Sequence, residues 1–240
     1  MGMTFLHKPL SLQTIMENPN TPVKFLVVRF SSIGDIVLTT PVVRGLKQQV
    51  AGAEVHFLTK PAFSGVAEAN PYIDQVHLLP PRFADLIDSL RQEHFDYLID
   101  LHHNLRTYRL KRRMRVMDFS FAKLNYEKWL MVKFKKNRLP NKHIVDRYLE
   151  TVSLFDVQDD GQGLDYFIPQ EGSYPATNLP EAFQAGFYVF TVGAGHATKQ
   201  MPVPDSIALL NQIGQPVILL GGKPDAARGS LIAQGVRTPV

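Results

Sequence analysis

The sequence contains no cysteine, which excludes disulfide bonds and thiolate metal sites and fits a reducing compartment. It also lacks any run of roughly 18 apolar residues of the kind that a membrane-spanning helix requires. Residues 1–22 hold no apolar stretch long enough for the core of a signal peptide. We therefore expect a cytoplasmic chain that does not span a membrane.

A strong overall charge is absent too, because the formal net charge at pH 7 is only +4. The basic residues are nevertheless concentrated: residues 105–147 hold fourteen lysines or arginines against three acids. This asymmetry predicts a face that meets an anionic partner, and the residues alone leave open nucleic acid, a phospholipid surface or a phosphorylated substrate. The interleaved aromatics, including the single tryptophan Trp129, suit an interfacial membrane patch or a domain-packing surface. No recognised nucleic-acid motif accompanies them, so we rank nucleic acid last.

What the sequence does contain is a regular alternation of strands and helices. Apolar β-branched runs predict strands and helical spacing predicts the helices between them: strands at 24–29, 53–58, 75–79 and 97–101, and helices following Asp35 and at 62–69, 83–93 and 142–155. Short links between these elements are typical of βαβ units in a parallel sheet. Pro41 is expected to kink or restart the first helix, since proline cannot donate a hydrogen bond to the preceding turn.

Changes in composition divide the 240 residues into parts, since domains cluster at roughly 100 to 150 residues. We predict a disordered lead-in, an N-terminal Rossmann-like domain, a linker and a second Rossmann-like domain, with bounds at 1–21, 22–157, 158–182 and 183–240. The second domain begins with the same strand, loop and helix pattern, with strands at 187–192 and 216–220. Two strands cannot build an open doubly wound sheet, so we expect this domain to be incomplete.

The first candidate for chemistry is Asp35, in the stretch from Lys24 to Pro41. A buried strand, a tight loop with Ser31, Ser32 and Gly34, and a helix start place this carboxylate at the carboxyl end of a strand. Ligands of open α/β sheets bind at that end, where a carboxylate can act as a general base. The alternative is that Asp35 only caps the amides of the helix.

The second candidate is the loop from Gly193 to Lys199, which follows a predicted strand. Its two glycines, the Thr198 hydroxyl, the Lys199 ammonium and the bare backbone amides of a helix N-terminus suit an anion such as a diphosphate, with a plain turn as the alternative. Its spacing fits neither a dinucleotide-binding fingerprint nor a Walker A loop. The turn before Asp225 has a parallel placement and would line the same crevice.

Metal binding is not expected. The spacing of His102, His103 and His196 does not match that of metal ligands. We therefore predict no metal; that no cofactor is needed is implied by the family resemblance given next.

Five motifs, in order, together resemble one known family: Val28–Arg44, Asp100–Arg106, Asn137–Pro140 with His143–Tyr148, Gly193–Lys199, and Leu219–Gly222. They are similar to the ADP-heptose:lipopolysaccharide heptosyltransferases, glycosyltransferase family nine, over roughly Val23 to the C-terminus. The resemblance implies an α/β fold of the GT-B type, with two Rossmann-like domains that have parallel sheets and face a cleft. It implies an inverting, metal-independent transfer of heptose, or a related sugar, from an ADP-sugar.

The resemblance also assigns roles to individual residues. It implies that Asp35 is the general base, and that the donor diphosphate and ribose meet four residues of the second domain, namely Gly195, Thr198, Lys199 and Asp225. It implies that the acceptor, an anionic glycolipid of the lipopolysaccharide inner core, meets Ser32, Gly34, Asn104 and Arg106. Such an acceptor lies at the inner face of the cytoplasmic membrane, so peripheral membrane contact is expected, and nucleic acid is not.

Family members continue for roughly another hundred residues and carry there a loop that completes the nucleotide-sugar site. The resemblance therefore implies a C-terminally truncated chain, with weak or absent donor binding and a second domain of low stability. The alternative function is a catalytically inactive remnant or binding module with a patch for a membrane surface or an anionic glycolipid. A nucleotide-dependent oxidoreductase is a weaker alternative, because the glycine fingerprint is missing.

Overall fold

The computed structural model describes residues 22–169 and 174–240, and the predicted lead-in at 1–21 lies outside the described residues. The chain divides into two compact units, Met1–Glu171 (unit 1) and Gly172–Val240 (unit 2). The boundary between them falls inside the range predicted as a linker, 158–182. None of the helices in the described part of the chain combines the length and the apolar character that a membrane-spanning helix needs.

Unit 1 is built on a five-stranded parallel sheet with the order β3-β2-β1-β4-β5. The strands are β1 (Val23–Val28), β2 (Ala53–Thr59), β3 (Gln75–Leu78), β4 (Tyr97–Asp100) and β5 (Met117–Ser120). Four of them confirm the predicted strands. The fifth was missed because β5 is a short edge strand that begins with the exposed residues Met117 and Asp118, so its pattern is not apolar.

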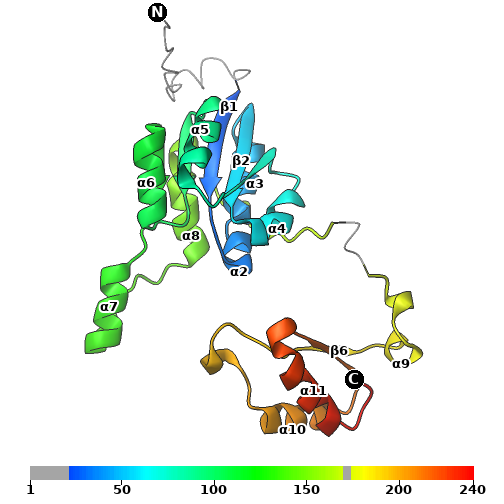
Figure 1. Ribbon diagram of the computed structural model, residues 1–240. Coiled ribbons are helices and arrows are strands. Elements are labelled where there is room, and N and C mark those ends of the chain that lie inside the picture. Colours follow the sequence, from blue (N-terminus) through cyan, green and yellow to red (C-terminus); the bar gives the residue numbers. More distant parts are fainter. Residues whose placement is uncertain (1–21, 170–173) are drawn as a thin grey trace, which may run out of the picture. The chain divides into compact units, whose positions relative to one another are not determined.

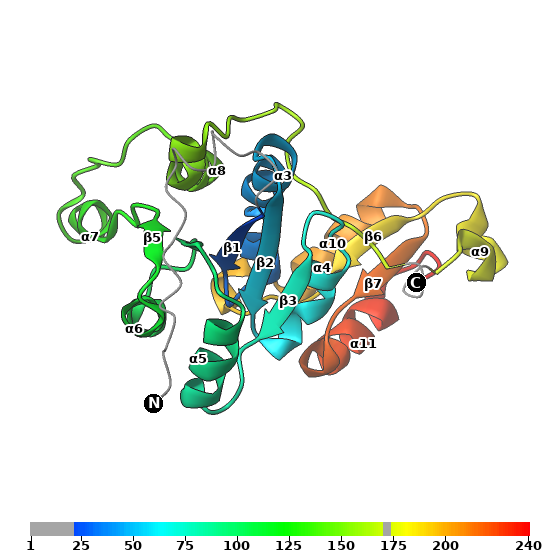
Figure 2. The same ribbon diagram turned by 90° about the horizontal axis from the view of Figure 1, so that it is seen from above.

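Helices cover both faces of this sheet, as Figure 2 shows. Seven α-helices belong to the described part of unit 1: α2 (Ile33–Val37), α3 (Thr40–Gln49), α4 (Ser64–Glu68), α5 (Phe83–Gln92), α6 (Leu105–Met114), α7 (Asn125–Phe134) and α8 (Ile144–Leu149). The helical segment is interrupted between α2 and α3. Pro41 lies in the first turn of α3, as expected for a proline that restarts a helix. The predicted helix at 142–155 is shorter: α8 ends at Leu149 and a 3₁₀ helix, Glu150–Phe155, continues it.

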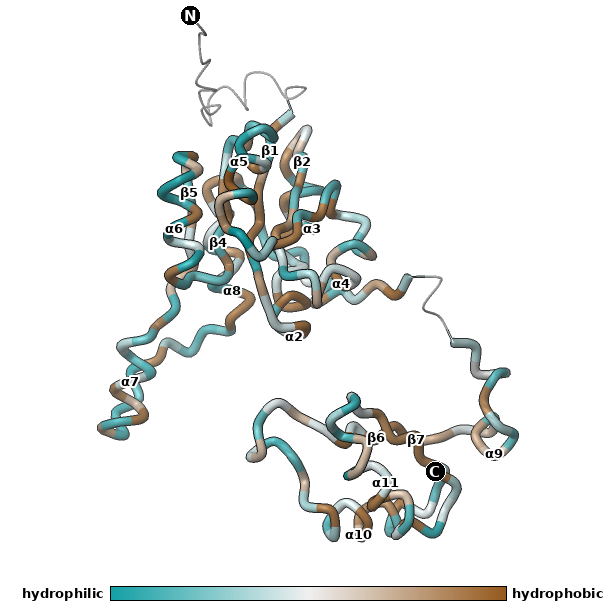
Figure 3. The backbone as a smooth tube through the Cα atoms, in the orientation of Figure 1, coloured by the Kyte–Doolittle hydropathy of each residue, from teal (hydrophilic) through white to brown (hydrophobic). Residues whose placement is uncertain are grey.

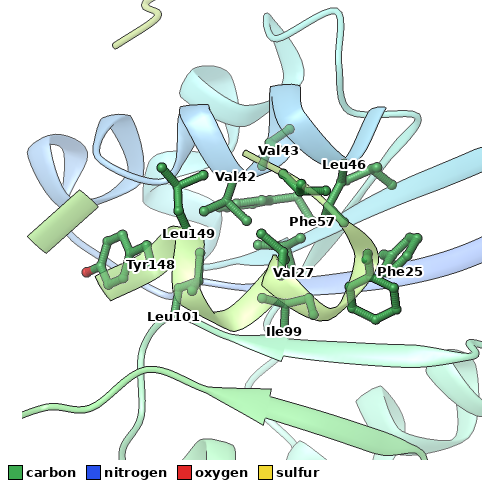
Figure 4. Close-up of a cluster of buried hydrophobic side chains, with 14 of the residues drawn as sticks. Phe25, Val27, Val42, Val43, Leu46, Phe57, Ile99, Leu101, Tyr148 and Leu149 are labelled. Atoms are coloured by element: carbon green, nitrogen blue, oxygen red, sulfur yellow. The ribbon is translucent and has the colours of Figure 1, made fainter. Parts of the chain in front are cut away.

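The central strand β1 feeds two hydrophobic cores. Phe25 and Val27 pack with α3, α8 and the 3₁₀ helix on one face, and Figure 4 shows part of this cluster. Leu26 and Val28 pack with α5 and α6 on the other face. A strand that is buried on both faces needs a continuous apolar run, which explains the pattern of β1 in the sequence.

Unit 2 has a two-stranded parallel sheet of β6 (Tyr188–Thr191) and β7 (Val217–Leu220). Its α-helices are α9 (Glu181–Gln184), α10 (Val203–Ile213) and α11 (Ala226–Gly235). Among its described residues, the buried hydrophobic core consists of Val192, Leu210, Val217 and Ile232. Figure 3 shows how the hydrophobic residues are distributed along both units. Unit 2 is an α/β unit with a much smaller core than unit 1.

Arg44, on α3, binds the segment that follows the 3₁₀ helix in unit 1. Its side chain is only 1% exposed; Nε and Nη2 donate to the Asp160 carboxylate at 2.6 and 2.7 Å, and Nη1 pairs with Asp165. The Asp165 amide donates to the Thr40 hydroxyl at 2.9 Å. Residues 160–165, within the range predicted as a linker, are therefore held against α3.

Candidate active site

Arg29 is the hub of the candidate site, directly after β1. Its guanidinium is 11% exposed and donates to the Ser31 carbonyl at 2.8 Å, the Leu101 carbonyl at 2.6 Å and the Tyr148 hydroxyl at 3.0 Å. Its remaining nitrogen, Nη2, lies 2.8 Å from Oδ2 of Asp35. Arg29 therefore joins the ends of β1 and β4 to α8 and holds the Asp35 carboxylate in place.

Asp35 lies two residues inside α2 rather than at its first residue, because the helix begins at Ile33 with Ser32 as its N-cap. Its Oδ2 accepts hydrogen bonds from the Ser32 amide at 3.1 Å and the Ser32 hydroxyl at 2.9 Å, in addition to the Arg29 contact. Asp35 therefore does cap the helix, which was the alternative to a role as general base, but capping occupies only one of its two oxygens. Oδ1 accepts no hydrogen bond from any described residue, and the side chain is 41% exposed.

The ionisation of Asp35 follows from these contacts. Burial alone would raise the pKa of the carboxyl, but the Ser32 amide and the Arg29 charge outweigh burial and leave its pKa below the usual value. Asp35 is therefore a carboxylate at neutral pH, with one fixed oxygen and one oxygen open to a ligand.

The loop after β4 forms the neighbouring wall of the site. Its shape depends on the fully buried Asp100, whose Oδ1 accepts from the amides of His102 and His103 at 3.1 and 2.7 Å. Nζ of Lys111 lies 3.5 Å from the other oxygen. Asp100 therefore has a structural role in turning this loop, so that His102 is presented beside Phe30, at a ring distance of 4.9 Å.

His102 is a neutral imidazole in this position. Burial lowers its pKa to about 4, and the positive charges of Arg29 and Lys123 act in the same direction. Its Nδ1 is buried and has no hydrogen-bond partner among the described residues. A ligand hydroxyl that reaches this nitrogen would satisfy it.

A cavity of about 770 Å³ opens beside this loop. Three of its lining side chains, Lys60, Arg106 and Arg109, are cationic, and no lining residue is acidic. The complete lining is Phe30, Lys60, Leu79, Pro80, Pro81, Phe83, His102, Asn104, Leu105, Arg106 and Arg109. Such a cavity favours a ligand that combines apolar surface with phosphate or carboxylate groups.

The four predicted acceptor residues fall into two pairs. Asn104 and Arg106 line the cavity, although the Asn104 side chain also caps α6 by accepting from the amides of Arg106 and Thr107 at 2.9 and 3.0 Å. Ser32 and Gly34 lie at Asp35 instead. A Cβ at Gly34 would meet no atom within 4 Å, so packing does not require glycine there.

One cluster in the described residues has the ligand atoms of a metal site: His56, His77 and Glu93. The two imidazoles contact each other at 2.8 Å, and the other ring nitrogen of His56 contacts Glu54 at 2.8 Å. The Lys24 ammonium lies 3.0 Å from Glu54 and 3.9 Å from Glu93. A cation already occupies this neighbourhood and both His56 nitrogens are engaged, so the cluster is accounted for as a hydrogen-bond network. None of its members lines the cavity.

The predicted donor residues belong to two loops of unit 2. Asp225 accepts from the Gly222 amide at 2.9 Å, and a Cβ at Gly193 would lie 2.1 Å from its carboxylate. A side chain at position 193 would therefore displace the Asp225 carboxylate from this position. The loops after β6 and β7 meet at Asp225, which lines a cavity of about 350 Å³.

Thr198 and Lys199 do not line that cavity. Both are exposed on a 3₁₀ turn, Ala197–Lys199, while α10 begins only at Val203. The lysine and the helix N-terminus, which we expected to form a single anion site, are thus separated in the chain. Gly195 is exposed as well, and a Cβ there would meet no atom within 4 Å.

Comparison with known proteins was made for sequence and fold. No family model matches the chain. A curated relative, lipopolysaccharide heptosyltransferase 1 of Campylobacter coli, is 25% identical over 150 residues, which are 57% of this chain and 44% of the relative. The chain resembles the family nine heptosyltransferases. The aligned part thus spans less than half the length of this relative.

Solved structures agree with this resemblance at the level of the fold. The glycosyl transferase family 9 protein of Veillonella parvula is 17% identical with a TM-score of 0.69, over 90% of this chain and 68% of its own. The heptosyltransferase WaaC of E. coli with ADP is 20% identical with a TM-score of 0.62, over 90% and 72%. The ADP-heptose lps heptosyltransferase II of E. coli is 18% identical with a TM-score of 0.63, over 90% and 70%. The predicted α/β fold of the GT-B type is thereby confirmed.

The sequence analysis missed four side chains of the candidate site: Arg29, Lys60, His102 as a ligand contact, and Arg109. Arg29 follows the buried strand β1 directly, and His102 comes two residues after the buried strand β4, so this position was an available signal for both. Arg109 belongs to the basic segment 105–147, which was predicted to meet an anionic partner but was not resolved to this residue, whereas Lys60 gave no such signal because it meets the cavity only after β2 is packed.

Proposed function

We propose that this chain acts as an inverting, metal-independent heptosyltransferase. It moves a heptose or related sugar from an ADP-sugar to an inner-core acceptor of lipopolysaccharide. The observation that carries the proposal is Asp35, with Oδ2 held by Arg29 and Ser32 and Oδ1 without a partner in the described part of the chain. This carboxylate lies in a unit that also contains a cationic cavity.

The reaction is a single displacement at the anomeric carbon of the donor heptose. An acceptor hydroxyl attacks this carbon as the bond to the β-phosphate oxygen of ADP breaks, and Oδ1 of Asp35 takes the hydroxyl proton. A positioned base of this kind contributes roughly 10² to 10⁴ in rate. Because the pKa of Asp35 is lowered, the base is ionised before the acceptor arrives. Attack on the face opposite the leaving group inverts the anomeric configuration.

The acceptor side of the proposal rests on charge. Lys60, Arg106 and Arg109 provide cations for the phosphate and carboxylate groups of an anionic glycolipid, while neutral His102 can hydrogen-bond a sugar hydroxyl. A lipid-linked acceptor places the reaction at a bilayer, which we propose is the inner face of the cytoplasmic membrane. This requires peripheral contact of the protein with the lipid surface.

The donor side is assigned to unit 2. Solved structures similar in fold are named with ADP and with ADP-2-deoxy-2-fluoro heptose. We propose that Gly195, Thr198 and Lys199 meet the diphosphate of such a donor, where the ammonium stabilises the departing ADP. Asp225, at the junction of the two loops, is proposed to meet the ribose.

The test is product formation by this chain from ADP-heptose, at high donor concentration, and a purified inner-core acceptor; measurable transfer would also contradict the expectation of weak or absent donor binding. Mass spectrometry is expected to show acceptor enlarged by one heptose residue, and nuclear magnetic resonance an inverted anomeric centre. Addition of EDTA should leave the rate unchanged. Absence of the enlarged acceptor at high enzyme concentration would contradict the proposal.

The small core of unit 2 and the exposure of Thr198 and Lys199 favour a second candidate, a binding module without catalysis. Calorimetric titration separates the two functions. A transferase binds the ADP-sugar, whereas the binding module binds only the acceptor and gives no heat with the donor.

A further inference from the structure

The segment between β5 and α8 projects from unit 1 as an arm, defined here as residues 121–143, with α7 at its far end. Figure 1 shows α7 set apart from the five-stranded sheet. Leu130 is the only buried residue of this helix. Large hydrophobic side chains are exposed along the rest of α7: Tyr126, Trp129, Met131, Val132 and Phe134.

The three aromatic rings of α7 form one cluster. Tyr126 and Trp129 stack with centroids 6.1 Å apart, and Phe134 meets Trp129 edge-on at 5.3 Å. The exposed fractions of these residues are 63%, 51% and 53%. Singly scattered apolar residues are normal on a protein surface, but a contiguous cluster marks a place of interaction.

Cations are frequent in the segment that carries this cluster. Between residues 119 and 145 the chain has seven lysines or arginines and one acid, Glu127. Five of the cations form no ion pair with any described residue: Lys128, Lys133, Lys135, Lys136 and Arg138. Tryptophan and tyrosine rings favour the interface between lipid and water, and lysines beside them attract anionic headgroups. We infer that α7 docks unit 1 on an anionic lipid bilayer.

The two ends of the arm, next to β5 and α8, connect it to the candidate site. Ser120 pairs in register with Asp100, so the arm leaves the same edge of the sheet at which the His102 loop lies. Nζ of Lys123 donates to the carbonyl of His103 at 3.2 Å, and Arg147 donates to that of Ala122 at 3.1 Å. A membrane contact at this edge suits an acceptor whose lipid stays in the bilayer while its sugar reaches Asp35. This choice of a bilayer over a protein partner rests on the proposed function.

Trp129 allows a direct test, since it is the only tryptophan in the chain. The whole chain is titrated with vesicles of phosphatidylcholine, with or without 30% phosphatidylglycerol. With the anionic vesicles, Trp129 emission should shift to the blue and be quenched by brominated acyl chains, whereas pure phosphatidylcholine should give little change. Binding without a blue shift, or a shift caused instead by a single-stranded oligonucleotide, would overturn the inference.

Matched variants separate α7 from general charge attraction. Removing one pair of cations, K135Q/K136Q, should weaken vesicle binding by about fivefold per cation. The control pair R112Q/R113Q, exposed on α6, should change binding less than twofold. Replacing two rings, Y126S/F134S, should weaken binding at least tenfold and leave the circular dichroism unchanged. Equal effects of the two cation pairs would overturn the assignment to α7.

The vesicle experiment and the transfer experiment can contradict the two proposals independently of each other. Binding of vesicles without transfer to any acceptor would contradict the proposed function and leave α7 as a docking element. Transfer to an acceptor stripped of its lipid should persist in Y126S/F134S, because the change affects only the lipid contact. Loss of that transfer in a folded variant would place α7 in the catalytic machinery and overturn the inference.

Discussion

In unit 1, every residue of the central strand β1 except Lys24 is buried, whereas in unit 2 three of the four residues of β6 are exposed. The first sheet is covered by helices on both faces, and the second rests on a core of four buried hydrophobic residues. Stability rises with the fraction of surface that a unit buries. The proposed base therefore belongs to the strongly supported unit, and the proposed donor loops to the weakly supported one.

This difference predicts that the two units unfold separately, with unit 2 first. Hydrogen exchange followed by mass spectrometry reports each unit on its own. A variant in one unit should change protection in that unit alone. Parallel changes in both units would show that they fold as one, and would contradict the predicted difference in stability between unit 1 and unit 2.

The largest expected effect in unit 1 comes from Arg44→Met. The change leaves the Asp160 and Asp165 carboxylates without their partner, and breaking a buried ion pair costs about 3 kcal/mol. Protection of residues 158–166 should fall while unit 2 stays unchanged. The matched control is Lys142→Met, which breaks a pair with Glu150 whose side chains are 43% and 51% exposed and should cost below about 0.5 kcal/mol. Equal effects of the two variants would contradict the buried clamp.

Unit 2 offers a comparable pair of glycines. In Gly193→Ala the new methyl group would lie 2.1 Å from the Asp225 carboxylate, so this carboxylate must shift and lose its hydrogen bond from the Gly222 amide, at a cost of about 1–3 kcal/mol. Gly195→Ala has open space and should leave stability within about 0.5 kcal/mol. Urea unfolding followed by hydrogen exchange measures both. An unperturbed Gly193→Ala would mean that the two loops do not meet at Asp225.

A smaller effect is expected from Tyr148→Phe. The ring keeps its contact with Phe121 at 4.8 Å, but the hydroxyl that accepts from Arg29 is lost. Loss of one hydrogen bond costs about 1 kcal/mol in unit 1. The rate of transfer should fall only slightly, because Arg29 keeps its contacts with Leu101 and Asp35. A rate reduced as far as by removal of the base itself would assign the hydroxyl a direct part in the chemistry.

The pH dependence of unit 1 gives a further, modest signal. Hydrogen bonds from Arg44 lower the pKa of Asp160 to about 2, from its ordinary value of 3.8. Because the folded-state pKa is depressed, this contribution to stability is complete above the ordinary value and is lost as the pH falls through about 2. Urea unfolding at steps between pH 5 and pH 2 should show the loss, and Asp160→Asn should flatten it. An unchanged slope in this variant would contradict the assignment.

Sequence patterns located most of the fold because its central strands are buried on both faces. The run Phe25–Val28 and the proline at the start of α3 are local signals, and both predictions were confirmed. Edge strand β5 was missed because an exposed strand has no need of an apolar pattern. The clamp of Arg44 on Asp160 was missed for another reason, since its partners lie 116 residues apart in the chain.

The candidate site was predictable to a similar degree. Asp35 was visible because a loop with a carboxylate follows a buried strand. The sequence did not show that the pKa of Asp35 is lowered while one of its oxygens stays free. These properties depend on Arg29, whose partners Leu101 and Tyr148 come from distant elements. The roles of Thr198 and Lys199 stay predictions, because their loop belongs to the other unit.

The proposed base is tested most directly by the rate of heptose transfer for Asp35→Asn, compared with Ser32→Ala. Asparagine keeps the shape of the side chain and can still accept from Ser32 but cannot take the proton, so the rate should fall roughly 10² to 10⁴-fold while the protein stays folded and binds the acceptor. Ser32→Ala removes one hydrogen bond from Oδ2 and should reduce the rate less than about tenfold. A folded Asp35→Asn protein that transfers heptose at a near-normal rate would contradict the assignment of Asp35 as the base.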